Sequence, residues 1–224
     1  MSATDGEIDV LILGTARAGS DAPAIEQALR DAAADWPGAG LATILPPSTL
    51  PALAHVTVSE GALPDAILTI RGTEAELADG LGATIARLSA MIDPQRSSLL
   101  ATTRHAILPG DDTVRLMFGL RRLERLSLAE FQDYWLNRHA QLGRRLIPPY
   151  TYHQLHTLPA ATEVLAAAAG VAPSTLDGIV EVHFPDVDAF VRQLSRPEVA
   201  EEALADERNF IDHDRSIFWA YRTL

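Results

Sequence analysis

Histidine, tyrosine and carboxylate side chains gather in the C-terminal half of this 224-residue chain. The stretch EFQDYWLNRHAQLGRRL, residues 130–146, places His139 four residues after Trp135 in a segment with helical periodicity. On such a helix His139 lies at the edge of the apolar stripe, where its imidazole can reach a cavity between the helix and a sheet. A neutral imidazole beside aromatic walls suits general acid/base chemistry, and the structural alternative is a ring that packs and binds a backbone carbonyl. His139 is therefore our first candidate base.

A second group of polar side chains follows in YTYHQLHTL, residues 150–158, which is typical of a strand. Tyr152, Gln154 and His156 are separated by even steps, so they share one face, and His153 points to the other. A face with phenol, amide and imidazole groups suits an oxygenated organic molecule, although it could instead be solvated or lie between two halves of the chain. We predict that Tyr152 and His156 are catalytic together with His139.

A third histidine, His183, lies in GIVEVHF, residues 178–184, on the same strand face as Glu181. It either joins the face of Tyr152 and His156 or is exposed. We predict that it contacts the substrate.

The segment ADERNFIDHD, residues 205–214, is acidic and contains His213. Asp206 or Asp212 could orient a histidine as the second member of an acid/base pair. His213 with Asp212 and Asp214 is only a local cluster, which favours a solvated loop or helix cap over a metal site. We therefore predict no metal.

Periodicity and helix caps predict the elements that must position these residues. In the first half we expect strands at 8–15, 40–45, 66–71 and 98–108, helices at about 22–36 and 74–92, and a further short strand at 55–58. In the second half we expect strands at 114–120, 150–158, 178–184 and 216–224, and helices at 128–146, 162–169, 187–194 and 198–207. The pairs Thr73 with Glu76 and Ser127 with Glu130 match capping boxes.

The order strand, helix, strand, strand, helix, strand occurs twice, which is typical of the ferredoxin-like or split βαβ unit. We predict an α+β chain with a diverged unit at residues 1–110 and a site-bearing unit at residues 111–224. An antiparallel sheet covered by helices on one side must bury its other face. We expect the two sheets to pack together within the chain as an α/β barrel.

Composition excludes several classes of function. The chain has no cysteine and no lysine, which removes thiolate chemistry, Schiff bases and the P-loop lysine. A formal net charge of −12 argues against nucleic acid and anionic membranes as partners. Residues 14–19, GTARAG, lack a nucleotide-binding pattern. No leader or long apolar run is present, so we expect a cytoplasmic location.

The motifs also resemble a known family. Glu130-Phe131, Tyr134-Trp135 and His139 are followed by the strand that ends near His156, by Asp177-Gly178, and by Asp206-Glu207 with Phe210-Ile211-Asp212. This order, over residues 113–224, resembles the EthD-like family of the dimeric α/β-barrel superfamily. The resemblance implies a ferredoxin-like fold with paired sheets. The superfamily includes cofactor-free monooxygenases, isomerases, dehydratase-like and cyclase-like enzymes, and haem proteins.

We therefore expect a cofactor-independent acid/base enzyme of lyase, dehydratase, isomerase or cyclase type, active in catabolism on a hydrophobic oxygenated molecule such as an aromatic or polyketide-like compound. Predicted substrate contacts are Phe131, Tyr134, Trp135, His183 and Phe184. The alternatives are a cofactor-free monooxygenase, a non-catalytic binding protein, and a haem protein with a histidine ligand. Exposed sheet edges also suggest a homodimer.

Overall fold

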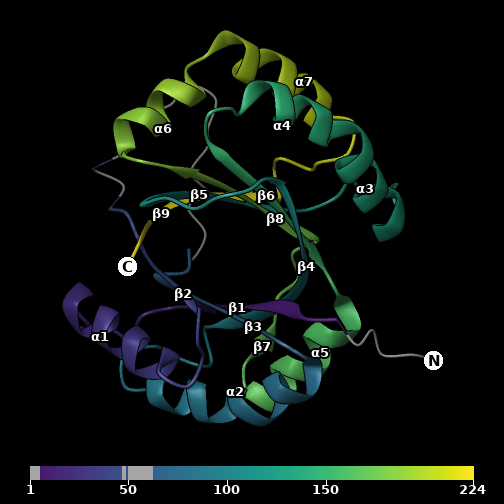
Figure 1. Ribbon diagram of the computed structural model, residues 1–224. Helices are drawn as coiled ribbons and strands as arrows, with labels where there is room; N and C mark the ends of the chain where they lie inside the picture. The colour runs from purple at the N-terminus through teal and green to yellow at the C-terminus, as the bar shows by residue number, and fades with distance from the viewer. Residues whose placement is uncertain (1–5, 47–48, 50–62) are drawn as a thin grey trace.

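The strands of the molecule form a closed ring. The structure, a computed structural model, describes residues 6–46, 49 and 63–224, and the predicted strand at 55–58 lies outside them. The strand order is β1-β3-β2-β9-β5-β8-β6-β4, and β4 pairs back with β1, which closes an antiparallel barrel. Helices α1, α2 and α5 cover one side of the barrel, and α3, α4, α6 and α7 cover the opposite side (Figure 1). The predicted α+β barrel is confirmed.

The first half of the chain forms the elements that its periodicity predicts. They are β1 (Ile8–Gly14), α1 (Ala22–Ala33), β2 (Gly40–Ile44), β3 (Ala66–Gly72), α2 (Glu74–Leu88) and β4 (Ser98–Leu108). The capping box of α2 is present, because the Thr73 hydroxyl accepts from the Glu76 N–H and the Glu76 carboxylate accepts from the Thr73 N–H.

The second half contains the remaining elements. They are β5 (Val114–Leu120), α3 (Leu128–Tyr134), the π-helical turn η2 (Trp135–His139), α4 (Ala140–Leu146), β6 (Thr151–Thr157), α5 (Pro159–Ala169), β7 (Ala172–Pro173), β8 (Gly178–Phe184), α6 (Val187–Leu194), the π-helical turn η3 (Val199–Ala203), α7 (Leu204–Glu207) and β9 (Ile217–Thr223). The Ser127–Glu130 capping box is also present.

Each half contributes four neighbouring strands to the ring. The orders β4-β1-β3-β2 and β6-β8-β5-β9 are both ferredoxin-like, and the pairs β2–β9 and β4–β6 join them. These joining pairs use the outer strands of both sheets, so the edges on which we based a homodimer are hydrogen-bonded within the chain. The homodimer and the boundary between residues 110 and 111 stay predictions.

Helix α5 belongs to the second half of the chain but packs on the first. Its Leu165 and Ala166 lie in one core cluster with Leu77 and Leu81 of α2. The helix begins at Pro159, three residues before the predicted start, because proline is suited to the first helical turn. Among the described residues, no helix is long and apolar enough to cross a membrane.

Candidate active site

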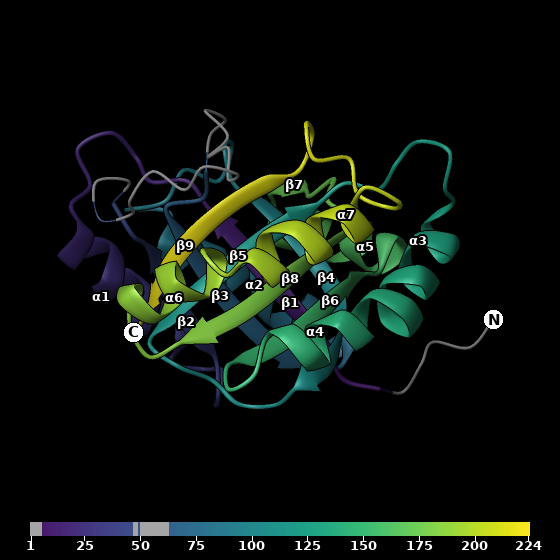
Figure 2. The same ribbon diagram turned by 90° about the horizontal axis from the view of Figure 1, so that it is seen from above.

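A cavity of about 220 Å³ lies between the outer face of the second sheet and the helices that cover it. Its floor is apolar and comes from β5, β8 and β9, and its roof comes from α4, α6, η3 and α7, which lie over these strands (Figure 2). Floor and roof include Leu116, Phe118, Val180, Val182, Phe218, Leu142, Leu146, Leu194 and Leu204. The polar residues at the cavity are His139, Tyr152, Glu207, His213 and Ser216. An apolar space with a few polar groups is typical of a small-molecule site.

His139 lines this cavity and is held by a carboxylate. Its side chain is buried, and Nδ1 lies 2.8 Å from Oδ2 of Asp206. Because a carboxylate accepts, Nδ1 carries the proton and donates it. Among the residues that the structure describes, none hydrogen-bonds Nε2 of His139. This nitrogen therefore keeps its lone pair for a molecule in the cavity.

A π-helical turn places His139 at the cavity. In this turn the N–H of Ala140 donates to the carbonyl of Trp135, and that carbonyl also accepts from Nε2 of Gln154 at 3.0 Å. A π turn inside a helix widens it by one residue and occurs frequently at functional sites. The extra residue rotates His139 from the edge of the stripe, where helical spacing puts it, into the buried face.

Tyr134 binds the carboxylate of the His139–Asp206 pair. Its hydroxyl donates to Oδ1 of Asp206 at 2.8 Å, and burial, followed by Asp206, raises the pKa of this phenol. Tyr134 does not line the cavity. The geometry is therefore consistent with the predicted orienting role of Asp206, and Tyr134 holds the Asp206 carboxylate from outside the cavity lining.

Tyr152 reaches the cavity from β6. Its hydroxyl oxygen accepts from Gln154 Nε2 at 2.8 Å and from Trp135 Nε1 at 3.3 Å. Both contacts use the oxygen, so the phenolic hydrogen stays available to donate. Burial raises the pKa of Tyr152 above the ordinary value. Tyr152 is therefore a neutral hydrogen-bond donor at physiological pH.

His156 shares its strand face with Tyr152 but lies outside the cavity lining. Its ring stacks on Trp135, with centroids 4.6 Å apart, and Nε2 donates to Oε1 of Gln154 at 3.0 Å. Burial, followed by the nearby His105, lowers the pKa of His156 to about 3. A neutral imidazole in this position orients Gln154, which in turn orients Tyr152.

Three aromatic residues that we predicted as substrate contacts lie in the core instead of at the cavity. Phe131 and Trp135 pack with Phe210, and Phe184 packs between Tyr150 and Phe190. None of these three residues, Phe131, Trp135 and Phe184, lines the cavity.

The position of Trp135 in the core explains why a glycine follows Asp177. A Cβ on Gly178 would lie 2.5 Å from the Trp135 ring and 2.8 Å from the carbonyl oxygen of Leu155. Only glycine therefore lets the indole lie against β8. The preceding Asp177 accepts from the backbone N–H of Arg122 and binds its guanidinium group. Trp135 of the Tyr-Trp motif and Gly178 of the Asp-Gly motif thus pack against each other.

A second histidine and carboxylate pair lies at the cavity, which sequence reasoning missed. Nε2 of His213 lies 2.9 Å from Oε2 of Glu207, and both residues line the cavity. Asp212, predicted as an orienting residue, binds Arg215 instead, at 2.7 Å. The available signal was the motif Asp206-Glu207, in which the second carboxylate precedes His213 by less than two helical turns.

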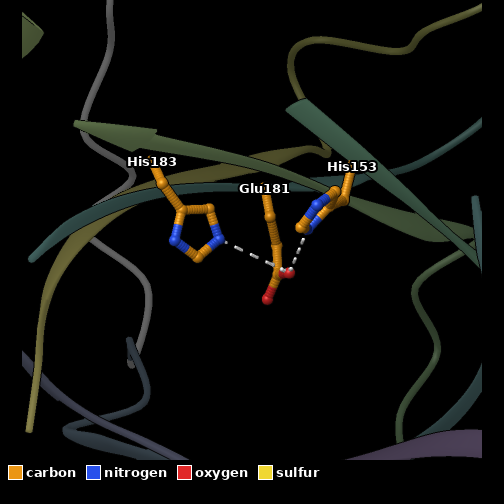
Figure 3. Close-up of side chains that lie close together, drawn as sticks. All are labelled: His153, Glu181 and His183. Carbon is orange, nitrogen blue, oxygen red and sulfur yellow. Dashed lines mark ion pairs between the residues drawn. The ribbon is translucent and has the colours of Figure 1, made fainter. Parts of the chain in front are cut away.

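His183 does not join the face of Tyr152, and it is not exposed. It points into the barrel with Glu181 and His153 (Figure 3). Its Nε2 lies 3.9 Å from Oε2 of Glu181, and Nδ1 of His153 lies 3.7 Å from the same oxygen. The reason is alternation: Val180 and Val182 of β8 face the cavity, so Glu181 and His183, which alternate with them, must face the barrel interior.

Two arginines occupy this interior cluster, which we define as Asp9, Arg104, Arg115, His153, Glu181 and His183. Nη1 of Arg104 lies 2.8 Å from both Glu181 Oε2 and His153 Nδ1, and Nη1 of Arg115 lies 3.2 Å from Glu181 Oε1. Burial by itself would raise the pKa of Glu181, but Arg115, His153, His183 and Arg104 together hold it well below the usual range.

The geometry of His153, Glu181 and His183 could hold a cation, since their ligand atoms lie within 4.8 Å of one another. However, Arg104 already binds two of the three candidate ligand atoms, and a second guanidinium group lies beside Glu181. A divalent ion would meet both positive charges. We therefore interpret the cluster as a charge network that stabilises the closed barrel.

Comparison with known proteins agrees with this architecture. A "putative monooxygenase" from Fusobacterium nucleatum subsp. nucleatum has 9% sequence identity over 97% of this chain and 92% of that chain, with a TM-score of 0.59. A "putative monooxygenase" from Lactobacillus acidophilus has 9% identity over 97% and 93% of the two chains, with a TM-score of 0.55. A mutant chlorite dismutase from Candidatus Nitrospira defluvii has 10% identity over 97% and 92%, with a TM-score of 0.52. At these identities the likeness shows the fold alone.

Sequence comparison adds the family. No curated protein matches the chain by sequence. Residues 123–214 match the profile of the EthD domain, and this range contains the helix of His139, the strand of Tyr152 and both carboxylates that hold histidines. The predicted resemblance to the EthD family is therefore confirmed over residues 123–214.

Proposed function

We propose that this protein is a cofactor-independent acid/base enzyme of lyase or isomerase type that acts on a small, mostly apolar, oxygenated molecule. The observation that carries the proposal is the His139–Asp206 pair, whose free Nε2 belongs to a buried imidazole at an apolar cavity. The cavity of about 220 Å³ is smaller than the roughly 300–1,000 Å³ that drug-sized ligands occupy. A molecule of about two fused rings fits this size class.

The residues divide into roles for proton abstraction next to a carbonyl group. Nε2 of His139 takes the proton from carbon, and Asp206 stabilises the imidazolium that forms. The electrons move into the carbonyl oxygen, and the Tyr152 hydroxyl donates a hydrogen bond to that oxygen. Elimination, isomerisation and cyclisation share this first step.

Haem does not fit this cavity. A haem is larger than a drug-sized molecule, whereas the cavity lies below the volume range of such ligands. The one free imidazole nitrogen of His139 faces an apolar space without room for a macrocycle. We therefore derive no step through haem.

Cofactor-free oxygenation is the second candidate, because two proteins of similar fold carry the name monooxygenase. The same base would form a carbanion, which then reacts with dioxygen. Incorporation of labelled dioxygen into the product distinguishes this reaction from a lyase or isomerase reaction, which proceeds equally without air.

The test uses α-tetralone, an apolar bicyclic ketone with exchangeable hydrogens next to its carbonyl group. The wild type in deuterium oxide should exchange these hydrogens, as followed by proton NMR. His139→Asn keeps a donor toward Asp206 but has no base, so exchange should slow by about 10²–10⁴-fold. Glu201→Gln, an exposed change in η3, is the control and should exchange like the wild type.

Equal exchange rates in the wild type and His139→Asn would overturn the acid/base role. If the ketone raises the melting temperature of both proteins and neither exchanges it, the non-catalytic binding function replaces the enzyme.

A further inference from the structure

We infer that His213 and Glu207 form a second acid/base pair in the same cavity, and that the enzyme is a dehydratase whose substrate class is the β-hydroxy ketones. The inference rests on the proposed function, in which His139 is the base. The second pair adds a proton donor on another wall of the cavity. Loss of water from a substrate requires both a base and an acid.

The two pairs reach the cavity from different elements. His139 comes from the helical roof, and His213 comes from the segment between α7 and β9. Their carboxylates, Asp206 and Glu207, are neighbours in α7. The ring of His213 lies 6.1 Å from that of Phe118, which belongs to the cavity floor. A bound molecule over this floor therefore has one imidazole from the roof and one from the loop.

The exposure of the two histidines differs in the direction that their roles require. The His139 side chain is 10% exposed, and the His213 side chain is 30% exposed. An acid that releases its proton to the leaving group in every turnover must regain it from water, so the more exposed imidazole is suited to this role. The buried one is suited to abstract a proton from carbon.

Loop stability does not require His213. The segment is already held by Asp212, which binds Arg215, by the Ser216 hydroxyl, which donates to the Asp212 carbonyl, and by a bridge between Ile211 and Arg122. These contacts fix the loop without the imidazole. The Glu207 carboxylate also faces the cavity, where burial of an acidic group has no structural benefit.

The proposed step balances as follows. Nε2 of His139 removes a proton from the carbon between the ketone and the hydroxyl-bearing carbon. Those electrons form a carbon–carbon double bond while the carbon–oxygen bond to the hydroxyl group breaks. Protonated His213 gives its proton to the departing oxygen, so the products are an unsaturated ketone and water. His213 then regains a proton from solvent, and His139 releases one.

The experiment compares two reactions on related probes. α-Tetralone exchanges hydrogens with a base alone, whereas the tetralone with a hydroxyl group β to its ketone loses water to give α-naphthol, which is followed by its fluorescence. His213→Gln keeps an N–H donor toward Glu207 but has no transferable proton. We expect it to retain hydrogen exchange and to dehydrate at least about 10²-fold more slowly than the wild type. His139→Asn should lose both reactions.

The outcomes separate the two proposals. If His213→Gln dehydrates the hydroxytetralone at the wild-type rate, the second pair is not an acid, and the role of His139 is unaffected. If His213→Gln loses both reactions in proportion and melts at a lower temperature, its role is structural and the inference is overturned. If the wild type catalyses neither reaction, the proposed function itself fails.

Discussion

Asp206 and Glu207 are consecutive residues of α7, and their carboxylates bind two different histidines, His139 and His213. Neighbouring residues of a helix point roughly 100° apart, so one short turn supplies both contacts. This arrangement ties the roof of the cavity to the loop that precedes β9. The positions of both imidazoles therefore depend on the four-residue helix α7. Separate substitutions of Asp206 and Glu207 can test the two contacts one at a time.

Asp206→Asn should greatly reduce the ability of His139 to act as a base, while the ketone still binds in the cavity. An amide in place of the carboxylate no longer stabilises the imidazolium and can favour the tautomer in which Nε2 carries the proton. We expect the rate of α-tetralone exchange at saturation to fall on the order of 10²–10⁴-fold while the ketone concentration for half-saturation changes little. A rise in that concentration with an unchanged maximal rate would show that Asp206 serves binding.

Asp212→Asn is the matched control for this variant. It removes an acidic group from the same segment, but its partner is the half-exposed Arg215. Exposed ion pairs contribute little, about 0–1 kcal/mol, so exchange and stability should stay close to those of the wild type.

Gly178→Ala should destabilise the fold through Trp135. The added Cβ would lie 2.5 Å from the indole and 2.8 Å from a backbone oxygen that cannot move away. Overpacking of this kind costs about 1–3 kcal/mol, measurable by urea unfolding. Gly82→Ala is the control, because its Cβ meets only one atom, at 3.4 Å, on an exposed face of α2. That change should stabilise the helix by about 0.5–1 kcal/mol, and equal losses in both variants would contradict the steric explanation.

Local patterns predicted the elements well because the fold uses local signals. The predicted capping boxes at Thr73 and Ser127 are both present, and each helix follows its cap. The repeated order of strands and helices then predicted the two joined sheets. These signals depend on neighbouring residues, so the sequence contains them directly.

The site was predicted less well because every residue of β6 is buried. Alternation divides Tyr152 from His153, but it does not say which face meets helices and which meets the barrel interior when both are covered. The same ambiguity misplaced His183. The Glu207–His213 contact depends on how the loop folds back, and the π turn that ends at His139 has no sequence pattern that we could use. Aromatic residues such as Phe184 were assigned to the cavity although they fill the core.

Glu181→Gln should destabilise the barrel more than any single change at its surface. The substitution removes the only buried negative charge beside Arg115 among the described residues and leaves that guanidinium group unpaired. Loss of one partner from a buried ion pair costs about 3–5 kcal/mol. Denaturant unfolding measures this loss, with Arg71→Gln as control, since Arg71 is half-exposed where it binds Asp9. A loss below about 1 kcal/mol would mean that the interior charges are solvated.

His156 should make the protein sensitive to acid. Its pKa is about 3 in the folded state and 6.5 as the ordinary value, so between these values the unfolded chain binds a proton that the folded chain does not. The free energy of unfolding therefore falls as the pH is lowered from about 6.5 toward 3, by up to about 1.4 kcal/mol per pH unit from this group. His156→Asn should be less stable at neutral pH, because the contact with Trp135 is reduced, yet should lose this part of the slope. Urea unfolding between about pH 4.5 and 6.5, inside the window that the two values define, measures both slopes, and identical slopes would show that His156 accepts a proton in the folded state.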